Sequence, residues 1–286
     1  METPVYKFEP QDYDTVYEPS EDSFLLLDAL EDELEAIKAR TPSLCVEIGP
    51  GSGVLIVALE KHLPARTSHF VGVDINPNAC RMTQKTCQLN GSSVDVVNMD
   101  LLAGIRPGCV DLLVFNPPYV PTQPTIDSLE EHIDEFHISG DDQNLVHAWA
   151  GGVDGRIVTD RVLADLNRIL SPEGIFYLLL LKENKPVEVL KQLQRTNFRG
   201  SIIKERRIRG EHLYVLRIER TKKIDSDEVL HVQDRVRIAR ELRIVPADVR
   251  FRIFHLLLQE VRLVEEQYDR NTLEGGIVHD RIEDVA

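Results

Sequence analysis

The sequence predicts an α/β fold in which a doubly wound, mostly parallel sheet has helices on both faces. Strand-like and helix-like segments alternate from residue 44 to residue 181, a pattern typical of such sheets. Residues 175–181 are apolar throughout, as expected for a central strand covered on both sides. Residues 49–53 form a glycine-rich turn between the first strand and a helix, the position at which sheets of this kind bind ligands.

The predicted elements follow one another along the chain in this alternating order. A helix is expected after Ser20, a favourable N-cap residue; it either covers the glycine-rich turn or is an ordinary amphipathic helix. Strands are expected at residues 44–48, 69–74, 94–98, 110–115, 175–181, 201–207 and 212–218. Further helices are expected to begin near Gly53, Pro77, Val158 and Pro186. Gly210 between the last two strands predicts a hairpin, and hence an antiparallel strand at the edge of the sheet.

Two domains are predicted, a sheet domain of residues 1–220 and a C-terminal extension of residues 221–286. The extension begins with a charged linker and continues as two helices, the second with apolar residues at helical spacing. This apolar stripe is expected to fold back on the sheet or to self-associate; the alternative is a partner helix.

Composition narrows the class of protein. The chain has 286 residues and is 42% hydrophobic, enough for a full core. We find no apolar stretch of the roughly 20 residues that a membrane span needs, and no basic segment leading into an apolar run at the N-terminus. The four cysteines form no Cys-x-x-Cys pair, so we expect reduced packing residues, no metal site, and a cytosolic or nuclear protein.

The formal net charge of −15 argues against binding of long nucleic acid, because phosphate neutralisation supplies most of that affinity. Four basic residues at positions 204, 206, 207 and 209 are interpreted as a solvated surface. The segment 121–144 is long and acidic. It either attracts a basic partner surface at the substrate entrance or is a solvated loop.

The glycine-rich turn predicts a site for a small charged ligand. An acidic residue precedes it, and its glycines alternate with other residues: Glu47, Gly49, Gly51, Gly53. A dinucleotide fingerprint would need its third glycine at position 54, which is Val54, so that class of site is excluded. Gly-x-Gly-x-Gly after an acid instead resembles the first motif of S-adenosylmethionine-dependent methyltransferases, and the Glu47 carboxylate suits a cationic amino group.

Acidic residues also follow the next two predicted strands. Asp74 ends the second strand, where an acid commonly binds ribose hydroxyls. Asp100 follows the third strand, where it would accept a hydrogen bond from an adenine amino group, with Leu101 against the ring. Each acid, taken alone, is also compatible with an ordinary helix cap.

The fourth strand runs directly into the sequence Asn116-Pro117-Pro118-Tyr119, which we call the hook. The Asn116 side chain and the Pro117 carbonyl can accept hydrogen bonds from a planar NH2 group and favour positive charge developing on its nitrogen. The prolines keep the backbone stiff, and the Tyr119 ring can cover the flat face of the substrate group. This arrangement predicts methylation of an amide or adenine nitrogen.

Taken together, these motifs resemble the eukaryotic branch of the HemK family. The peptides that carry the resemblance are residues 17–23, 47–53, 74–77, 111–120, 149–152 and 182–184. The resemblance spans about residues 13–219 and implies a class I S-adenosylmethionine-dependent methyltransferase fold, Rossmann-like, with seven strands and one antiparallel edge strand.

The resemblance also implies roles for individual residues. The positions expected to bind S-adenosylmethionine are Ser23, Glu47, Gly49, Gly51, Gly53, Asp74, Asp100, Leu101 and Asn116. The positions expected to hold the target amide are Asn116, Pro117, Pro118 and Tyr119. The implied substrate is the glutamine of a Gly-Gly-Gln loop in the class 1 translation termination factor, and the implied partner is a small zinc-ribbon activator subunit that shields an apolar sheet edge.

Several alternatives remain at the level of sequence. The same hook occurs in adenine-N6 methyltransferases acting on DNA or RNA, although the net acidity of this chain counts against them. Protein-lysine (histone) methylation is a second activity implied by the family. Methylation of a small molecule, or a non-catalytic scaffold that binds a partner through the extension, would also use this fold.

Overall fold

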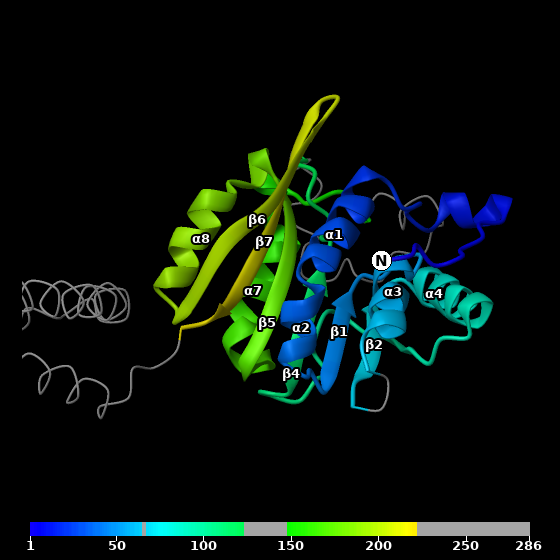
Figure 1. Ribbon diagram of the computed structural model, residues 1–286. Coiled ribbons are helices and arrows are strands. Elements are labelled where there is room, and N and C mark those ends of the chain that lie inside the picture. The colour runs from blue at the N-terminus through cyan, green and yellow to red at the C-terminus, as the bar shows by residue number, and fades with distance from the viewer. Residues whose placement is uncertain (65–66, 123–147, 222–286) are drawn as a thin grey trace, which may run out of the picture. The chain divides into compact units, whose positions relative to one another are not determined.

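The computed structural model describes residues 1–64, 67–122 and 148–221 (Figure 1). The chain divides into two compact units, Met1–Arg220 and Thr221–Ala286, and the first contains the sheet. The predicted helices of the C-terminal extension lie outside the described residues, as does the acidic segment from residue 123 onward. Among the described residues, no helix is both long and apolar enough to cross a membrane.

Within the described residues, the strands form one seven-stranded sheet in the order β3-β2-β1-β4-β5-β7-β6. They are β1 (Leu44–Ile48), β2 (His69–Asp74), β3 (Asp95–Asn98), β4 (Val110–Phe115), β5 (Leu170–Leu181), β6 (Phe198–Ile208) and β7 (Glu211–Arg220). The pairs β1–β2, β1–β4, β2–β3 and β4–β5 are parallel. The predicted doubly wound α/β sheet is therefore confirmed.

The antiparallel part of the sheet is the hairpin β6–β7. β7 runs antiparallel to both β5 and β6, and β6 is the outermost strand. Gly210 has a φ of 91° in the turn, a conformation that glycine adopts without steric cost. The predicted hairpin at one edge is confirmed, and within it β7 is the strand inserted antiparallel.

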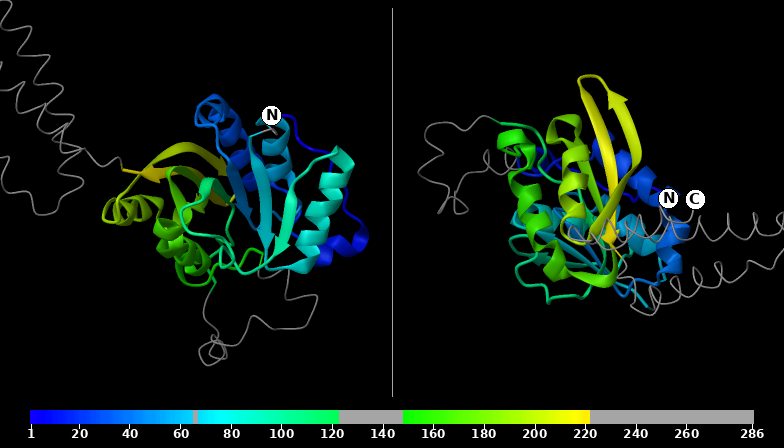
Figure 2. Two further views of the ribbon diagram at one scale, coloured as in Figure 1. Left: turned by 90° about the horizontal axis from the view of Figure 1, so that it is seen from below. Right: turned by 90° about the vertical axis from the view of Figure 1, so that its left-hand side faces the viewer.

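Helices cover both faces of the sheet (Figure 2). Helices α1 (Glu21–Asp32), α2 (Leu34–Ala39), α3 (Val54–His62) and α4 (Pro77–Asn90) cover one face, and α7 (Ile157–Ile169) and α8 (Pro186–Gln194) cover the other. Short 3-10 helices are η1 (Pro10–Asp14), η3 (Val153–Gly155) and η4 (Lys182–Asn184). Strand β4 shows how the two cores form: Leu112 and Val114 pack with the first layer, and Leu113 and Phe115 with the second, because successive side chains of a strand point to opposite faces.

The helix starts agree with the sequence, but one capping interaction differs. Ser20 occupies the N-cap position of α1, as predicted, yet its side chain makes no capping hydrogen bond. At α4, by contrast, the Asn76 side chain accepts a hydrogen bond of 2.9 Å from the backbone N–H of Asn78, and Pro77 follows at the first helical position. The start of α1 is therefore held by other contacts, which belong to the site.

Candidate active site

The ends of three neighbouring strands bring several of the predicted site residues together. Ile48 of β1 pairs with Val73 of β2 and with Phe115 of β4. The next residues of these three strands are Gly49, Asp74 and Asn116, so they form one row along the carboxyl edge of the sheet. Because neighbouring strands lie about 4.8 Å apart, the backbones of Asp74 and Asn116 are roughly 10 Å from each other.

The glycine-rich turn adopts a backbone that few other residues could form. Gly49, Gly51 and Gly53 have φ values of 61°, 51° and 82°. A Cβ atom on Gly53 would lie 2.9 Å from Cγ2 and 3.1 Å from Cα of Thr83 on α4, so only glycine allows this approach of the two helices. The backbone N–H of Gly51 faces the Asp74 carboxylate at 3.4 Å, which ties the turn to the end of β2.

Glu47 is buried beneath this turn and carries an unsatisfied oxygen. Its side chain is 1% exposed, and burial raises its pKa from 4.5 to about 8, with the charge of Asp74 adding to the shift and a backbone hydrogen bond from Ile56 opposing it. Among the described residues, Oε2 of Glu47 has no hydrogen-bond partner. A buried acceptor without a partner costs about 1–3 kcal/mol, so this atom fits the amino group of a cationic ligand.

Asp74 and Asp100 are placed differently from each other. Burial raises the pKa of Asp74 to about 6, against the effect of backbone hydrogen bonds from Asn76, Gly51 and Ile75. Asp100 is half-exposed and pairs with Arg161 at 2.5 Å, while Leu101 has a φ of 47°, which is unusual for a residue with a side chain. The predicted contacts of Asp74 with a ribose, and of Asp100 and Leu101 with an adenine, stay predictions.

The hook carries a second unsatisfied oxygen. Asn116 donates from Nδ2 to Oδ2 of Asp22 at 2.9 Å. Its own Oδ1 is buried and has no partner among the described residues. The NH2 end of the carboxamide is therefore held by Asp22 of α1. The oxygen at its other end can accept a hydrogen bond from a substrate.

Asp22 is the residue that the sequence interpretation missed. In the sequence it is simply an acid in the first turn of a helix, yet it is 3% exposed and accepts four hydrogen bonds. The donors are Asn116 Nδ2 at 2.9 Å, Tyr119 Oη at 3.1 Å, Tyr17 Oη at 3.2 Å and Ser23 Oγ at 3.4 Å. Asp22 and Asn116 lie 94 residues apart in the sequence, so no local pattern signals this contact.

These contacts also locate Ser23 and Tyr119. Ser23 is buried in the first turn of α1, where its hydroxyl faces Asp22; its predicted contact with the cofactor stays a prediction. Tyr119 is 8% exposed and packs in the core layer beneath α1, and burial together with the charge of Asp22 raises the pKa of its hydroxyl. The predicted packing of the Tyr119 ring on a substrate amide likewise stays a prediction.

The hook is supported from behind by a buried asparagine and a glycine. Asn184 is fully buried and donates to the Tyr119 carbonyl at 2.7 Å and to the Asp154 carbonyl at 2.9 Å. A Cβ atom on Gly155 would lie 2.0 Å from the Tyr119 carbonyl oxygen. Gly155 has a φ of 65°. The segments around positions 151 and 184 therefore both support the backbone of the hook.

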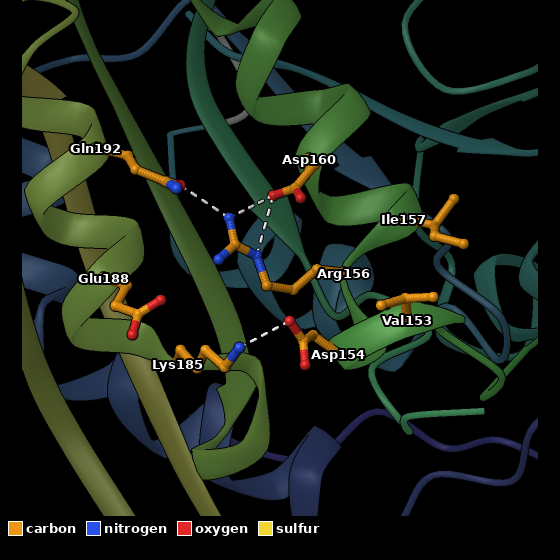
Figure 3. Close-up of a pocket in the computed structure, with 8 residues that line it drawn as sticks. All are labelled: Val153, Asp154, Arg156, Ile157, Asp160, Lys185, Glu188 and Gln192. Carbon is orange, nitrogen blue, oxygen red and sulfur yellow. Dashed lines mark hydrogen bonds and ion pairs between the residues drawn. The ribbon is translucent and has the colours of Figure 1, made fainter. Parts of the chain in front are cut away.

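A pocket of about 400 Å³ lies between α7 and α8, and no residue of the hook or of the glycine-rich turn lines it. Its lining residues are Val153, Asp154, Arg156, Ile157, Asp160, Lys185, Glu188 and Gln192. Figure 3 shows the Arg156 guanidinium between Asp160 and Gln192, and Lys185 turned toward Asp154. Because these cations are paired with neighbours, we interpret this pocket as part of the packing behind the hook and not as the catalytic site.

The fold and the site define a class I S-adenosylmethionine-dependent methyltransferase. Comparison with known proteins agrees: the family Methyltransferase small domain matches residues 21–135. "Methyltransferase HEMK2" of Mus musculus is 40% identical over 209 residues, covering 72% of this chain and 90% of that protein. The "eRF1 methyltransferase catalytic subunit mtq2" of Schizosaccharomyces pombe is 35% identical over 231 residues, covering 76% and 95%. The chain belongs to the HemK family, in its eukaryotic-type branch.

A solved structure supports the same assignment. The structure described as that of the "E. cuniculi Mtq2-Trm112 complex" responsible for methylation of the eRF1 translation termination factor matches with a TM-score of 0.52 and 30% identity, covering 72% of this chain and 98% of that chain. S-adenosylmethionine fits the residues present, because the glycine-rich turn permits close approach and Oε2 of Glu47 is a buried acceptor that no described residue bonds.

Proposed function

We propose that this methyltransferase methylates the side-chain amide nitrogen of a protein glutamine, in the Gly-Gly-Gln loop of the class 1 translation termination factor. The observation that carries this proposal is Oδ1 of Asn116, a buried acceptor without a partner among the described residues. It lies on the same row of strand ends as Gly49 and Asp74. The names of the relatives support the substrate, since the fission yeast protein is an eRF1 methyltransferase subunit.

The chemistry requires alignment more than strong acid or base catalysis. S-adenosylmethionine, when bound, supplies an electrophilic methyl group attached to a positively charged sulfur. The amide nitrogen is a poor nucleophile because its lone pair is delocalised. An NH2 hydrogen donated to Asn116 Oδ1, and another donated to the Pro117 carbonyl, would orient that lone pair and stabilise the positive charge that develops on nitrogen.

The proton balance needs no dedicated base. As the bond from nitrogen to the methyl carbon forms, the bond from that carbon to sulfur breaks, and the nitrogen becomes acidic. Water can then accept the proton. Asp22 is occupied by four hydrogen-bond donors, so we assign it no proton transfer.

A small partner subunit is part of the proposal. The related E. cuniculi protein Mtq2 is described in a complex with Trm112. In this chain, β3 ends the sheet and is short, with Val97 38% exposed and Ile75 just after β2 43% exposed. An uncovered strand edge with exposed apolar side chains is a place where another chain adds on. We propose that a small activator subunit of the zinc-ribbon type covers this edge.

We further propose a cytosolic or nuclear location. The four cysteines are free, which is usual in reducing compartments, and a translation factor is a substrate of the cytosol. Fractionation of cells that express the tagged chain tests this proposal, and recovery in a secreted fraction contradicts it.

The direct test of the reaction is mass spectrometry of the termination factor after incubation with the enzyme, its activator subunit and the methyl donor. One added methyl group on the glutamine of the Gly-Gly-Gln loop is the expected product. Asn116→Ala should lower kcat by about 100- to 1,000-fold, as loss of one preorganised hydrogen-bonding group does elsewhere. Methylation of duplex DNA in preference to the protein, measured in the same tube, would instead favour the adenine alternative.

A further inference from the structure

The orientation of the Asn116 side chain is set by its hydrogen bond to Asp22. A carboxamide has two nearly isosteric orientations, with either oxygen or NH2 facing a given neighbour. The Asp22 carboxylate, as an acceptor, has no hydrogen to donate. The NH2 of Asn116 must therefore face it, which agrees with the distance of 2.9 Å between Nδ2 and Oδ2, and Oδ1 must point away.

Asp22 is itself held in one position. Tyr119 donates to the same oxygen, Oδ2, at 3.1 Å, and Tyr17 donates to the other oxygen, Oδ1, at 3.2 Å. Ser23 adds a longer contact to Oδ1 at 3.4 Å. With its carboxylate 3% exposed and bonded at both oxygens, Asp22 cannot rotate toward solvent without leaving several donors unpaired, each at a cost of about 1–3 kcal/mol.

The consequence concerns the reacting nitrogen. If Asn116 turned over, its NH2 would face the substrate NH2, and two donors would oppose each other. With Asp22 in place, the oxygen faces the substrate, and the hydrogen of the target amide finds an acceptor. A side chain without such a hydrogen, such as the carboxylate of glutamate, would face that oxygen with its own oxygen and be repelled.

We propose that Asp22 is a positioning residue that holds the Asn116 carboxamide with Oδ1 toward the substrate nitrogen, so that the site selects a nitrogen bearing hydrogens. This inference deepens the proposed function and rests on it. The juxtaposition that carries it is a buried carboxylate on α1, bonded to the NH2 of a hook asparagine whose oxygen has no partner within the described part of the chain.

The test is a double-mutant cycle in the full chain with its activator subunit. Asp22→Ala should lower kcat for the termination factor by about 100-fold, the size of effect that misplacement of a reacting group produces, while the Kd of S-adenosylmethionine stays near that of the wild type. In an Asn116→Ala background, Asp22→Ala should cause no further loss, because a residue that acts through another has nothing left to position.

Two further variants keep the test informative. Asp28→Ala removes a carboxylate from the same helix, one that pairs with Arg206 at the surface, and should leave kcat unchanged. If Asp22→Ala does not fold, Asp22→Asn keeps the shape of the side chain and permits both orientations of Asn116. It should then give a smaller loss of kcat that also disappears in the Asn116→Ala background.

Losses that multiply in the double variant would overturn the proposal, because Asp22 would then act independently of Asn116. So would a loss confined to the Kd of S-adenosylmethionine. Failure of the proposed function has a different signature: the wild-type enzyme would transfer no methyl group to the termination factor. If the wild type methylates that factor and the two losses of kcat multiply in the double variant, only the positioning role of Asp22 is refuted.

Discussion

Two side-chain oxygens are the strongest indication of what the site binds. Oε2 of Glu47 and Oδ1 of Asn116 are both buried and both lack a partner among the described residues. Glu47 lies in β1, and Asn116 follows the adjacent strand β4. Folding alone would favour their replacement by apolar groups. Their presence at the carboxyl edge of the sheet is explained if Oε2 of Glu47 binds the amino group of the cofactor and Oδ1 of Asn116 binds the substrate amide.

The raised pKa of Glu47 leads to a prediction about stability. Its folded-state pKa of about 8 exceeds its ordinary value of 4.5, so the folded protein binds more protons than the unfolded chain between these two pH values. The free energy of unfolding should therefore fall as pH rises from about 4.5 to 8 and change no further through this group above that range. Glu47→Gln should flatten this dependence and should raise the Tm of the ligand-free protein at pH 8, while weakening binding of S-adenosylmethionine.

Thermal unfolding of the ligand-free protein from pH 5 to pH 9 measures this effect. Glu188→Gln, a change at an exposed position of α8, serves as the control and should keep the wild-type slope. A Glu47→Gln variant with the same slope as the wild type would show that Glu47 is not the group that titrates. Unchanged affinity for the methyl donor would show that Oε2 does not contact the cofactor.

A second prediction concerns the glycine beneath the hook. Gly155 and Gly108 have nearly equal φ values of 65° and 67°, but a Cβ on Gly155 would meet the Tyr119 carbonyl at 2.0 Å, whereas one on Gly108 would meet nothing within 4 Å. Gly108→Ala should cost about 1 kcal/mol of stability through backbone conformation alone. Gly155→Ala should cost a further 1–3 kcal/mol or so through overpacking and should also lower kcat by displacing the hook.

The measurement is denaturant unfolding of both variants, together with kcat at saturating methyl donor. Equal losses of stability would show that the contact with the Tyr119 carbonyl is relieved by movement elsewhere. An unchanged kcat in a destabilised Gly155→Ala variant would separate the support beneath the hook from the chemistry.

At the level of residues, the sequence predicts those site groups that follow a strand end. Glu47, Asp74 and Asn116 are visible because each follows or ends an apolar run, and parallel strands bring such positions to one edge. Asp22 is not visible in this way. It lies in the first turn of a helix, where an acid is already explained by the helix dipole. Its role depends on tertiary contacts with Tyr119 and Asn116, which local spacing does not encode.

Among the elements, strand positions agree closely with the sequence in the middle of the sheet and less closely near its hairpin. β1, β2 and β4 have the predicted bounds, because glycine or polar residues end each apolar run. β5 begins at Leu170, before the predicted 175, since Leu170 pairs with Val110 although a Ser-Pro-Glu-Gly sequence follows it. Its start is set by a neighbouring strand and not by local preference.

The contact between α1 and β6 shows that two of the basic residues interpreted as a solvated surface, Lys204 and Arg206, form ion pairs. Lys204 pairs with Asp32 at 2.5 Å, and Arg206 pairs with Asp28 at 2.5 Å and with Glu21 at 3.1 Å. These two cations therefore contact the acidic face of α1 and are not simply solvated, as the sequence suggested. Ion pairs of this exposure contribute about 1 kcal/mol or less each, so the loss of one of them leaves α1, the helix that carries Asp22, in place.

The position of β3 at the edge of the described sheet gives a prediction about the partner subunit. Val97→Lys places a charge on the exposed edge strand and should weaken binding of the activator subunit by about tenfold or more, with little change in the stability of the isolated chain. Leu89→Lys is the matched control, because Leu89 is 48% exposed on the neighbouring helix α4. The dissociation constants of the two variants, measured by titration calorimetry, compare the two surfaces directly. Equal binding by Val97→Lys and the wild type would place the activator elsewhere.

Across the whole molecule, the net charge and the chemistry of the site depend on different residues. The formal net charge of −15 belongs to the entire chain, whereas the site depends on a few buried acids and one carboxamide. Net acidity disfavours a phosphate backbone as the main binding partner and is compatible with a basic protein surface. The sheet order and the row of strand ends bring the site residues together but contain no group that recognises a substrate. The choice of substrate therefore rests on the hook and its surroundings.

The division of the chain predicts where catalysis resides. The unit Met1–Arg220 contains every site residue named above, the whole sheet and both core layers. A variant that ends at Thr221 should therefore fold, bind S-adenosylmethionine with unchanged Kd and methylate the termination factor with unchanged kcat. Circular dichroism and titration calorimetry test the first two outcomes, and single-time-point mass spectrometry tests the third. A folded variant that binds the methyl donor but has lost kcat would show that residues 222–286 contribute to the reaction, and a higher KM alone would assign them to capture of the protein substrate.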